Sequence, residues 1–248
     1  MPYKKNFLTK VIFQLRFDPI ISVESEGPDC FQEKICGEWP RTKEMKELQV
    51  EASLEKDKPV RTEVKSVKRR WVFASQDGRK TLTVGSDIFS LEYGKYENIG
   101  ATKGDFEFLW GHFTECYTLS ELSRVGLRYI NEIVLPTGDP LDWAGYIADE
   151  VLGATLKGWE AEQLRLARSF HELHLVAEDY RLAFKFGIMN SDFPNPIAKR
   201  EFILDYDCVS LGPVESSRVP GCLVAYNEVI GNRFERSIGS RLREEMSP

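Results

Sequence analysis

The order of elements that the hydrophobic pattern predicts occurs twice along this chain, and this repetition constrains the fold more than any single motif. Each copy consists of a strand, a short helix, three strands and an amphipathic helix, and the second copy starts at residue 124. Equivalent elements are offset by about 115 to 120 residues, a period that suits a two-fold duplication rather than a solenoid. Because few residues are identical between the copies, the inference rests on element order. We expect an α+β fold of two tandem units, residues 1–120 and 121–248, packed as one pseudo-two-fold assembly with helices backing antiparallel sheets.

The hydrophobic period and the turn residues place the elements of each copy. In the first copy we expect a strand at 11–17, a short helix at 29–38, an exposed loop or surface helix at 40–60, strands at 62–73, 81–84 and 88–93, and a helix at 106–117 that starts near Gly104 and Asp105. In the second copy we expect a strand at 125–135, a helix at 141–152, a hairpin of strands at 163–175 and 181–188, a loop at 190–196, a strand at 200–209 and a closing helix at 223–242. The apolar faces of these elements predict a core that contains Trp110, Phe113, Leu127, Tyr226, Ile230 and Phe234.

Composition excludes several classes of protein. The net charge of −6 and the pI near 5.3 disfavour nucleic acid as a partner, because non-specific binding needs many cations. No stretch approaches the roughly 18 to 20 apolar residues of a membrane span, and the N-terminus lacks a secretion signal, so we expect a cytoplasmic protein that does not contact membranes. Five scattered cysteines, an odd number without C-x-x-C spacing, predict reduced thiols and no structural zinc site.

One dense basic run is the exception to the acidic composition. It consists of Lys65, Lys68, Arg69 and Arg70, followed by Trp71. Such a run can clamp and stack nucleic acid. It is equally typical of an exposed hairpin strand that balances an acidic chain, and the sequence leaves both interpretations open.

A polar sheet face is the candidate binding surface. Alternate residues of a strand share a face, which places Arg124, Gly126, Arg128 and Glu132 together, opposite the apolar residues of the same strand. Arg16 is expected on the matching face of the first copy, and Asp205 and Asp207 share a face of the last strand. Guanidinium groups and carboxylates in one groove can bind a ligand or a partner. The alternative is cross-strand ion pairing on a solvated sheet, where each pair contributes under about 1 kcal/mol.

Catalytic motifs are weak or missing in this sequence. Asp205 and Asp207 are too few to hold a divalent metal ion without a third ligand. His171 and His174 resemble part of an H-E-x-x-H motif, but their spacing differs and a strand sends them to opposite faces. Gly-x-Ser-x-Gly, Walker and G-x-G-x-x-G sequences are absent, and Cys208 is better interpreted as a packed apolar residue. The sequence therefore predicts no cofactor and no metal, and it leaves catalysis undecided while favouring a non-enzymatic role.

The run Arg124-Val125-Gly126-Leu127-Arg128-Tyr129-Ile130-Asn131 resembles the signature of a sporadically distributed prokaryotic family of unknown function, in which an R-x-G-L-R-Y-x-N strand lies in the middle of the chain. Residues 11–17 resemble the opening V-x-F-x-L-R-F strand of that family, and Trp71 with Asp77 and Gly78 resembles its W-x-F-x-x-x-D-G hairpin. Residues 202–207 and 232–242 resemble its L-D-x-D strand and F-E-x-x-I helix, although Gly239 stands where a helix-favouring or polar residue is expected. The patchy distribution of the family resembles that of genes on mobile or defence-associated loci.

These observations and the resemblance lead to ranked expectations for function. The first is an adaptor or regulatory protein, in a mobile or CRISPR-like defence operon, that binds a protein partner through the polar sheet face. The second is a sensor that binds a small anionic ligand through Arg16, Arg124 and Arg128. The third is a metal-dependent phosphoesterase or nuclease that uses Asp205 and Asp207. A closed arginine-lined pocket would favour the ligand, and an open surface with apolar residues would favour the protein partner.

Overall fold

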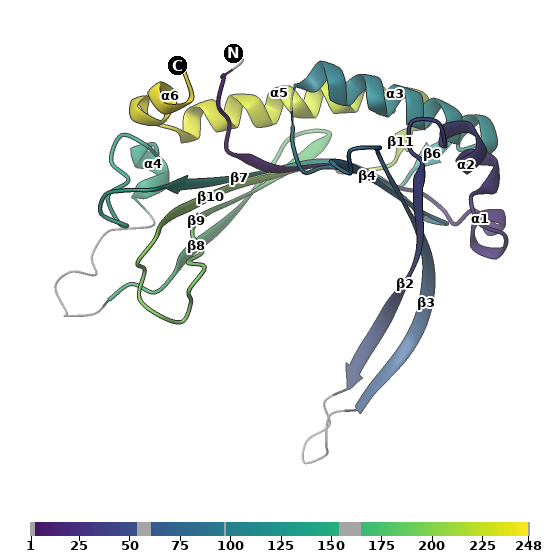
Figure 1. The fold of residues 1–248 in the computed structure, drawn as a ribbon, viewed down its shortest axis with the longest axis horizontal. Helices are drawn as coiled ribbons and strands as arrows, with labels where there is room; N and C mark the ends of the chain where they lie inside the picture. The colour runs from purple at the N-terminus through teal and green to yellow at the C-terminus, as the bar shows by residue number, and fades with distance from the viewer. Residues whose placement is uncertain (1–2, 54–60, 97, 154–164, 248) are drawn as a thin grey trace.

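A single curved sheet organises the computed structural model, which describes residues 3–53, 61–96, 98–153 and 165–247 (Figure 1). All pairings between its nine strands are antiparallel. From one edge to the other, the strands are β2 (Arg41–Ser53), β3 (Arg61–Ala74), β4 (Lys80–Gly85), β5 (Ile88–Tyr93), β1 (Leu8–Arg16), β7 (Arg124–Leu135), β10 (Arg200–Ser210), β9 (Tyr180–Ile188) and β8 (Ser169–Val176). The first strands of the two expected units, β1 and β7, therefore pair at the centre of the sheet.

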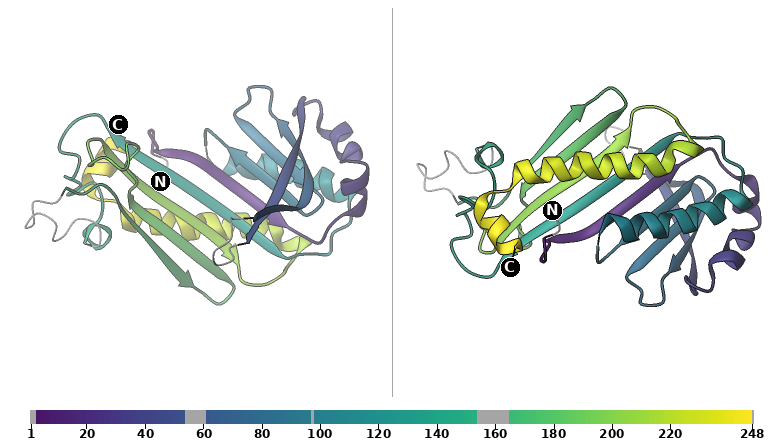
Figure 2. Two further views of the ribbon diagram at one scale, coloured as in Figure 1. Left: turned by 90° about the horizontal axis from the view of Figure 1, so that it is seen from below. Right: turned by 90° about the horizontal axis from the view of Figure 1, so that it is seen from above.

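In the described part of the chain, helices cover only the convex face of this sheet. The two long helices, α3 (Ile99–Cys116) and α5 (Val219–Ser237), lie side by side across it (Figure 2). The shorter elements are α1 (Ile21–Ser25), α2 (Asp29–Ile35), α4 (Asp149–Leu152), the 3-10 helix η2 (Ser216–Arg218), α6 (Ser240–Met246) and the small two-stranded sheet of β6 (Glu121–Leu122) and β11 (Val214–Glu215). No described helix is both long and apolar enough to cross a membrane. The concave face of the sheet carries no helix in the described part of the chain (Figure 1).

The core lies between the convex face and the helices. In β1, Val11, Phe13 and Leu15 are fully buried, and the alternate residues are half-buried on the concave side. Phe13 meets Phe106 of α3 edge to face, with 4.7 Å between ring centroids, a geometry that favours aromatic pairs. The core prediction is confirmed for Trp110, Phe113, Leu127, Tyr226 and Ile230, whereas Phe234 is only partly buried against the core.

The expectation of a loop or surface helix over residues 40–60 is wrong for its described part. Residues 41–53 form β2, which pairs with β3 in a two-stranded ribbon that extends away from the body (Figure 1). Leu48 and Val67, on the ribbon, are both more than 40% exposed. A strand that buries neither face has no reason to alternate apolar and polar residues, so the periodic signal is missing. Residues 54–60 lie outside the described part.

Three helix boundaries also differ from the expectation. The helix at 106–117 begins earlier, at Ile99, because the Asn98 side chain caps it by accepting a hydrogen bond of 2.9 Å from the Ala101 backbone. The helix expected at 141–152 is reduced to α4, because Gly145 has φ +75°, which ends helical geometry. The helix expected at 223–242 divides into α5 and α6 at Gly239.

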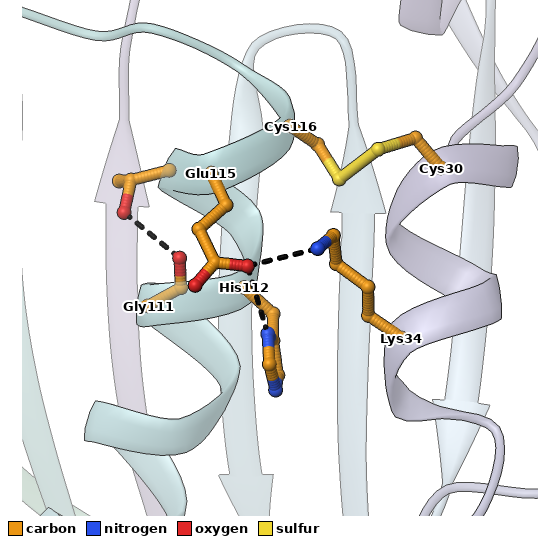
Figure 3. The surroundings of a disulfide bond; sticks show 7 residues. Cys30, Lys34, Gly111, His112, Glu115 and Cys116 are labelled. Atoms are coloured by element: carbon orange, nitrogen blue, oxygen red, sulfur yellow. Dashed lines mark hydrogen bonds and ion pairs between the residues drawn. A yellow bond between two sulfur atoms is a disulfide. The ribbon is translucent and has the colours of Figure 1, made fainter.

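The expectation that all five cysteines are reduced is wrong for Cys30 and Cys116. A disulfide joins them and links α2 to the end of α3 (Figure 3). The two cysteines are 86 residues apart in sequence, so neither the number of cysteines nor their spacing indicates that this pair is bonded. Beside it, the Glu115 carboxylate lies 2.9 Å from Lys34 Nζ of α2 and 3.2 Å from His112 Nδ1 (Figure 3). The free thiols are those of Cys36, Cys208 and Cys222.

Candidate functional site

The central strands place three arginines on the concave face. In the β1–β7 pairing, Arg16 lies directly opposite Arg124, and Gln14 lies opposite Gly126. The predicted shared face of Arg124, Gly126 and Arg128 is confirmed, because their partners Arg16, Gln14 and Ile12 all belong to the concave side of β1. Like charges directly opposite each other across a sheet are unfavourable unless counter-charges or a ligand offset them. The arrangement of the counter-charges therefore decides what this face can bind.

Arg128 already has a strong partner inside the molecule. Its Nε and Nη2 atoms donate to the two carboxylate oxygens of Asp205, at 2.8 and 2.6 Å. Asp205 is 5% exposed, so its carboxylate is largely desolvated, whereas the Arg128 side chain is 39% exposed. The pair is bidentate, the geometry in which arginine binds a carboxylate most strongly. The hydrogen bonds to Asp205 outweigh burial and raise the pKa of Arg128. Arg128 and Asp205 thus hold β7 to β10 and are not free to bind an incoming anion.

Arg124 is held more loosely. Its Nη1 donates to Gln14 Oε1 at 2.8 Å, and its Nη2 lies 3.5 Å from Asp207 Oδ2. Burial raises the pKa of Asp207 although both Arg124 and Arg128 act to lower it. Above Gly126, where no side chain rises from the sheet, these groups surround a hollow of about 160 Å³. The Arg124 side chain is 37% exposed.

Of the three arginines, Arg16 lies farthest from its counter-charge. Its Nη1 is 3.9 Å from Asp87 Oδ2, in the turn between β4 and β5. Asp87 also lies 2.5 Å from Lys68 Nζ and 2.7 Å from Arg70 Nη1, so one carboxylate serves three cations. Burial acts to raise the pKa of Asp87, but the hydrogen bonds and charges of Lys68 and Arg70 prevail and lower it.

The described cations of the basic run are therefore engaged within the molecule. Lys68 and Arg70 meet Asp87, and Arg70 also donates to Glu47 at 2.8 Å. Arg69 donates to Glu44 at 2.9 Å and lies 4.7 Å above the ring of Trp71, which is itself buried. The Lys65 side chain lies outside the described part. These contacts favour the interpretation of a charge-balanced hairpin strand over a nucleic-acid clamp.

Glu132 does not join the arginines. It shares their face of β7 but lines a separate hollow of about 390 Å³, together with Arg168 and Glu201. The six sequence-predicted residues thus divide into a central group of Arg16, Arg124, Arg128, Asp205 and Asp207 and an outlying Glu132.

The two histidines and Cys208, which the sequence also singled out, each contact or pack against neighbouring side chains. His171 pairs with Phe186 in register and stacks on its ring, whereas His174 pairs with Ala183 and lies 3.0 Å from Glu172, so the two histidines do face opposite ways. Cys208 is fully buried, and burial raises the pKa of its thiol to about 12. Among the described residues, no three His, Cys, Asp or Glu side chains are grouped to hold a metal ion.

Sequence reasoning missed two residues that contact the central group, Gln14 and Asp87. Gln14 follows directly from the alternation of β1 and could have been identified with Arg16. Asp87 could not, because it lies in a turn where no periodicity applies, and only the pairing of β5 with β1 brings it beside Arg16. A scan against protein-family models and a search of the curated proteins gave no match to this chain.

Proposed function

We propose that the protein is a non-enzymatic interaction module whose concave sheet face binds a protein partner. The observation that carries the proposal is the placement of Arg16 directly opposite Arg124 on the two central strands. Their nearest counter-charges, Asp87 and Asp207, lie 3.9 and 3.5 Å away and are shared with other cations. An acidic side chain of a partner would complete the charge balance of this pair.

The surroundings of the two arginines suit a protein surface. The half-buried side chains of Ile12, Ile130 and Ile203 lie on the same face, between the charged groups. An apolar centre interleaved with paired charges and arginines is typical of protein interfaces. A polyanion, by contrast, needs many free cations, and Arg128 and Arg70 are already paired closely with Asp205 and Asp87.

A small anionic ligand is the second candidate. The hollow above Gly126 is the observation in its favour, because Arg124 and Arg128 border it. Its volume of about 160 Å³ is below the roughly 300 to 1,000 Å³ of small-molecule sites, so it suits one carboxylate or phosphate group rather than a whole ligand. We rank a metal-dependent phosphoesterase or nuclease third, since Asp205 and Asp207 both face arginines.

We further propose that the two halves of the fold derive from a duplication. Outward from the central pair of β1 and β7, the sheet continues as β5, β4 and β3 on one side and as β10, β9 and β8 on the other. A long helix follows β5 in the first half and β10 in the second. Superposing residues 8–120 on 121–245 should align β1 with β7 and α3 with α5. Halves that cannot be superposed in this order would reject the duplication.

The resemblance to a prokaryotic family whose patchy distribution is similar to that of genes on mobile or defence-associated loci supports a role as an adaptor or regulator, with a partner encoded by a neighbouring gene. Affinity purification from the native host, with the wild-type chain as bait, tests the proposal. The Arg16→Gln, Arg124→Gln double variant, used as bait, should no longer capture the partner protein. Lys10→Gln is the matched control, because Lys10 occupies the same face of β1 but pairs with Glu92 at 2.8 Å. Capture by the folded double variant at the wild-type level would count against the concave face.

A further inference from the structure

A well-formed hollow lies on the convex side of the sheet, away from the arginines. It has a volume of about 610 Å³ and is bordered by α5, the start of α3, the N-terminal segment and the helix-facing side of β7. This volume is within the roughly 300 to 1,000 Å³ of small-molecule sites. We refer to it as the convex cleft.

Polar groups of β7 form the base of the convex cleft. The Tyr129 hydroxyl donates to Asn227 Oδ1 of α5 at 2.7 Å and lies 3.3 Å from the Tyr96 hydroxyl. Asn131 is 4% exposed, and its Nδ2 donates to the carbonyl oxygen of Leu204 at 3.2 Å. Its Oδ1 accepts no hydrogen bond from the described residues. A buried amide with an unused acceptor beside an open volume is a group that a ligand can satisfy.

Aromatic and apolar side chains line the walls. Tyr96 and Tyr129 lie with their ring centroids 5.5 Å apart, and Phe7, Ile99, Ile230 and Phe234 border the same space. A mostly apolar wall with a few convergent polar groups is the usual composition of a ligand site. Flat rings are the shapes that such aromatic walls accommodate best.

The charges of the convex cleft disfavour anionic ligands. Glu228 and Glu235 line it, whereas no lysine or arginine is among its described lining residues. Glu235 accepts hydrogen bonds from the Tyr3 hydroxyl and from Arg243 Nε, but Glu228 is exposed at the rim with no cation beside it in the described part. A phosphate placed here would meet the uncompensated charge of Glu228.

We propose that the convex cleft binds a small, uncharged, planar heteroaromatic molecule with hydrogen-bonding edges, of which a nucleoside without a phosphate is the simplest example. Asparagine side chains present both an amide donor and a carbonyl acceptor, which is the pairing that a base edge requires. This site is independent of the proposed partner surface, since the two lie on opposite faces of the sheet. Its occupant differs in charge from the anion that the concave arginines would bind.

A titration with adenosine, guanosine, cytidine and uridine, each compared with its 5′-monophosphate, tests the proposal on the full chain. At least one nucleoside should bind at millimolar concentration or below and raise the melting temperature, as a ligand of the native state must. Its monophosphate should bind about tenfold more weakly. Absence of binding by all four nucleosides, or a monophosphate that binds as well as its nucleoside, would overturn the proposal.

Two glycines of α5 provide a matched pair of variants. Gly231 lines the convex cleft and Gly221 does not, and a Cβ added at either position meets no atom within 4 Å. Gly231→Leu should fill the cleft and weaken nucleoside binding by about tenfold or more, whereas Gly221→Leu should leave it unchanged. Both substitutions replace glycine inside a helix, so neither should impair folding. Nucleoside binding that survives Gly231→Leu would place the ligand elsewhere.

Discussion

At the scale of single residues, the departure of Gly239 from the family pattern has a steric cause. Its backbone N–H donates to the carbonyl of Tyr146 at 2.8 Å, where α5 gives way to α6. A Cβ on Gly239 would overlap the carbonyl oxygen of Gly145, a backbone atom that cannot turn aside. The close approach of the two backbones at Gly239 separates α5 from α6, where the apolar spacing predicted one continuous helix.

We therefore expect Gly239→Ala to lower the free energy of unfolding by about 1 to 3 kcal/mol, as overpacking does. Gly221→Ala in α5 is the control, and it should raise stability by about 0.5 to 1 kcal/mol because alanine favours a helix. Urea unfolding of both variants provides the comparison. Equal stabilities for the two variants would mean that the backbones of Gly145 and Gly239 do not touch.

The two arginines of β7 should differ in their effect on stability. Arg128→Ala leaves the buried Asp205 carboxylate without its partner and should cost about 1 to 3 kcal/mol. Arg124→Ala breaks a longer and more exposed contact with Asp207 and should cost under about 1 kcal/mol. Chemical denaturation of both variants measures the difference. A loss for Arg124→Ala as large as that for Arg128→Ala would contradict the assigned roles.

Sequence reasoning could predict which residues share a face but not which of them are close. The alternation of β7 was sufficient to place Arg124 and Arg128 together, because the period of a strand is a local property. The separation of Glu132 from them, the burial of Asp205 and the contact of Asp87 with Arg16 depend on register and on the curvature of the sheet. The convex cleft was missed for the same reason, since its walls come from segments far apart in the sequence.

At the scale of elements, the turn between β4 and β5 connects β1 and β3 through Asp87. Because the pKa of Asp87 is lowered in the folded protein, its contribution to stability is present above the unfolded pKa and is lost as the pH falls through the folded pKa. We expect wild-type stability to decrease on acidification below about pH 4. Asp87→Asn should be less stable at neutral pH and should lose less on acidification. Parallel pH profiles for the two proteins would show that Asp87 is not the group responsible.

The disulfide between α2 and α3 is the other inter-element link that we expect to affect stability. The two cysteines are 86 residues apart, a separation for which loop-closure entropy gives a stabilisation of about 4.6 kcal/mol. Cys116→Ser, or a reducing agent on the wild type, should therefore lower the melting temperature markedly. Cys36→Ser, at an exposed free thiol, is the control and should have little effect. A wild-type melting temperature that is insensitive to reduction would contradict a stabilising role for the disulfide.

Elements with one buried face were predictable, and those without one were not. The strands near the centre and the helices over them show the expected periods because each must bury one side. Strand β2 of the ribbon was not predicted, because its exposed residues do not alternate between apolar and polar. The helix at 141–152 failed for a different reason, because the left-handed Gly145 interrupts an otherwise apolar pattern.

At the scale of the whole molecule, the curvature of the sheet separates two candidate surfaces. In the described part of the chain the helices lie on the convex side and none lies on the concave side (Figures 1 and 2). The convex cleft is bordered by α3 and α5, whereas Arg16 and Arg124 lie on the concave side. We propose that the concave side binds a protein through the paired arginines. Each arginine that gains a carboxylate partner in an interface would contribute about 1.5 to 3 kcal/mol.

The most direct measurement is calorimetric titration of the captured partner into the wild type, the Arg16→Gln, Arg124→Gln double variant and the Lys10→Gln control. With both arginines removed, the affinity should fall by about 100-fold or more, which corresponds to about 3 kcal/mol. Lys10→Gln should bind within about threefold of the wild type, because its charge is already matched by Glu92. A double variant that is folded and binds the partner as tightly as the wild type would show that Arg16 and Arg124 do not form the binding surface.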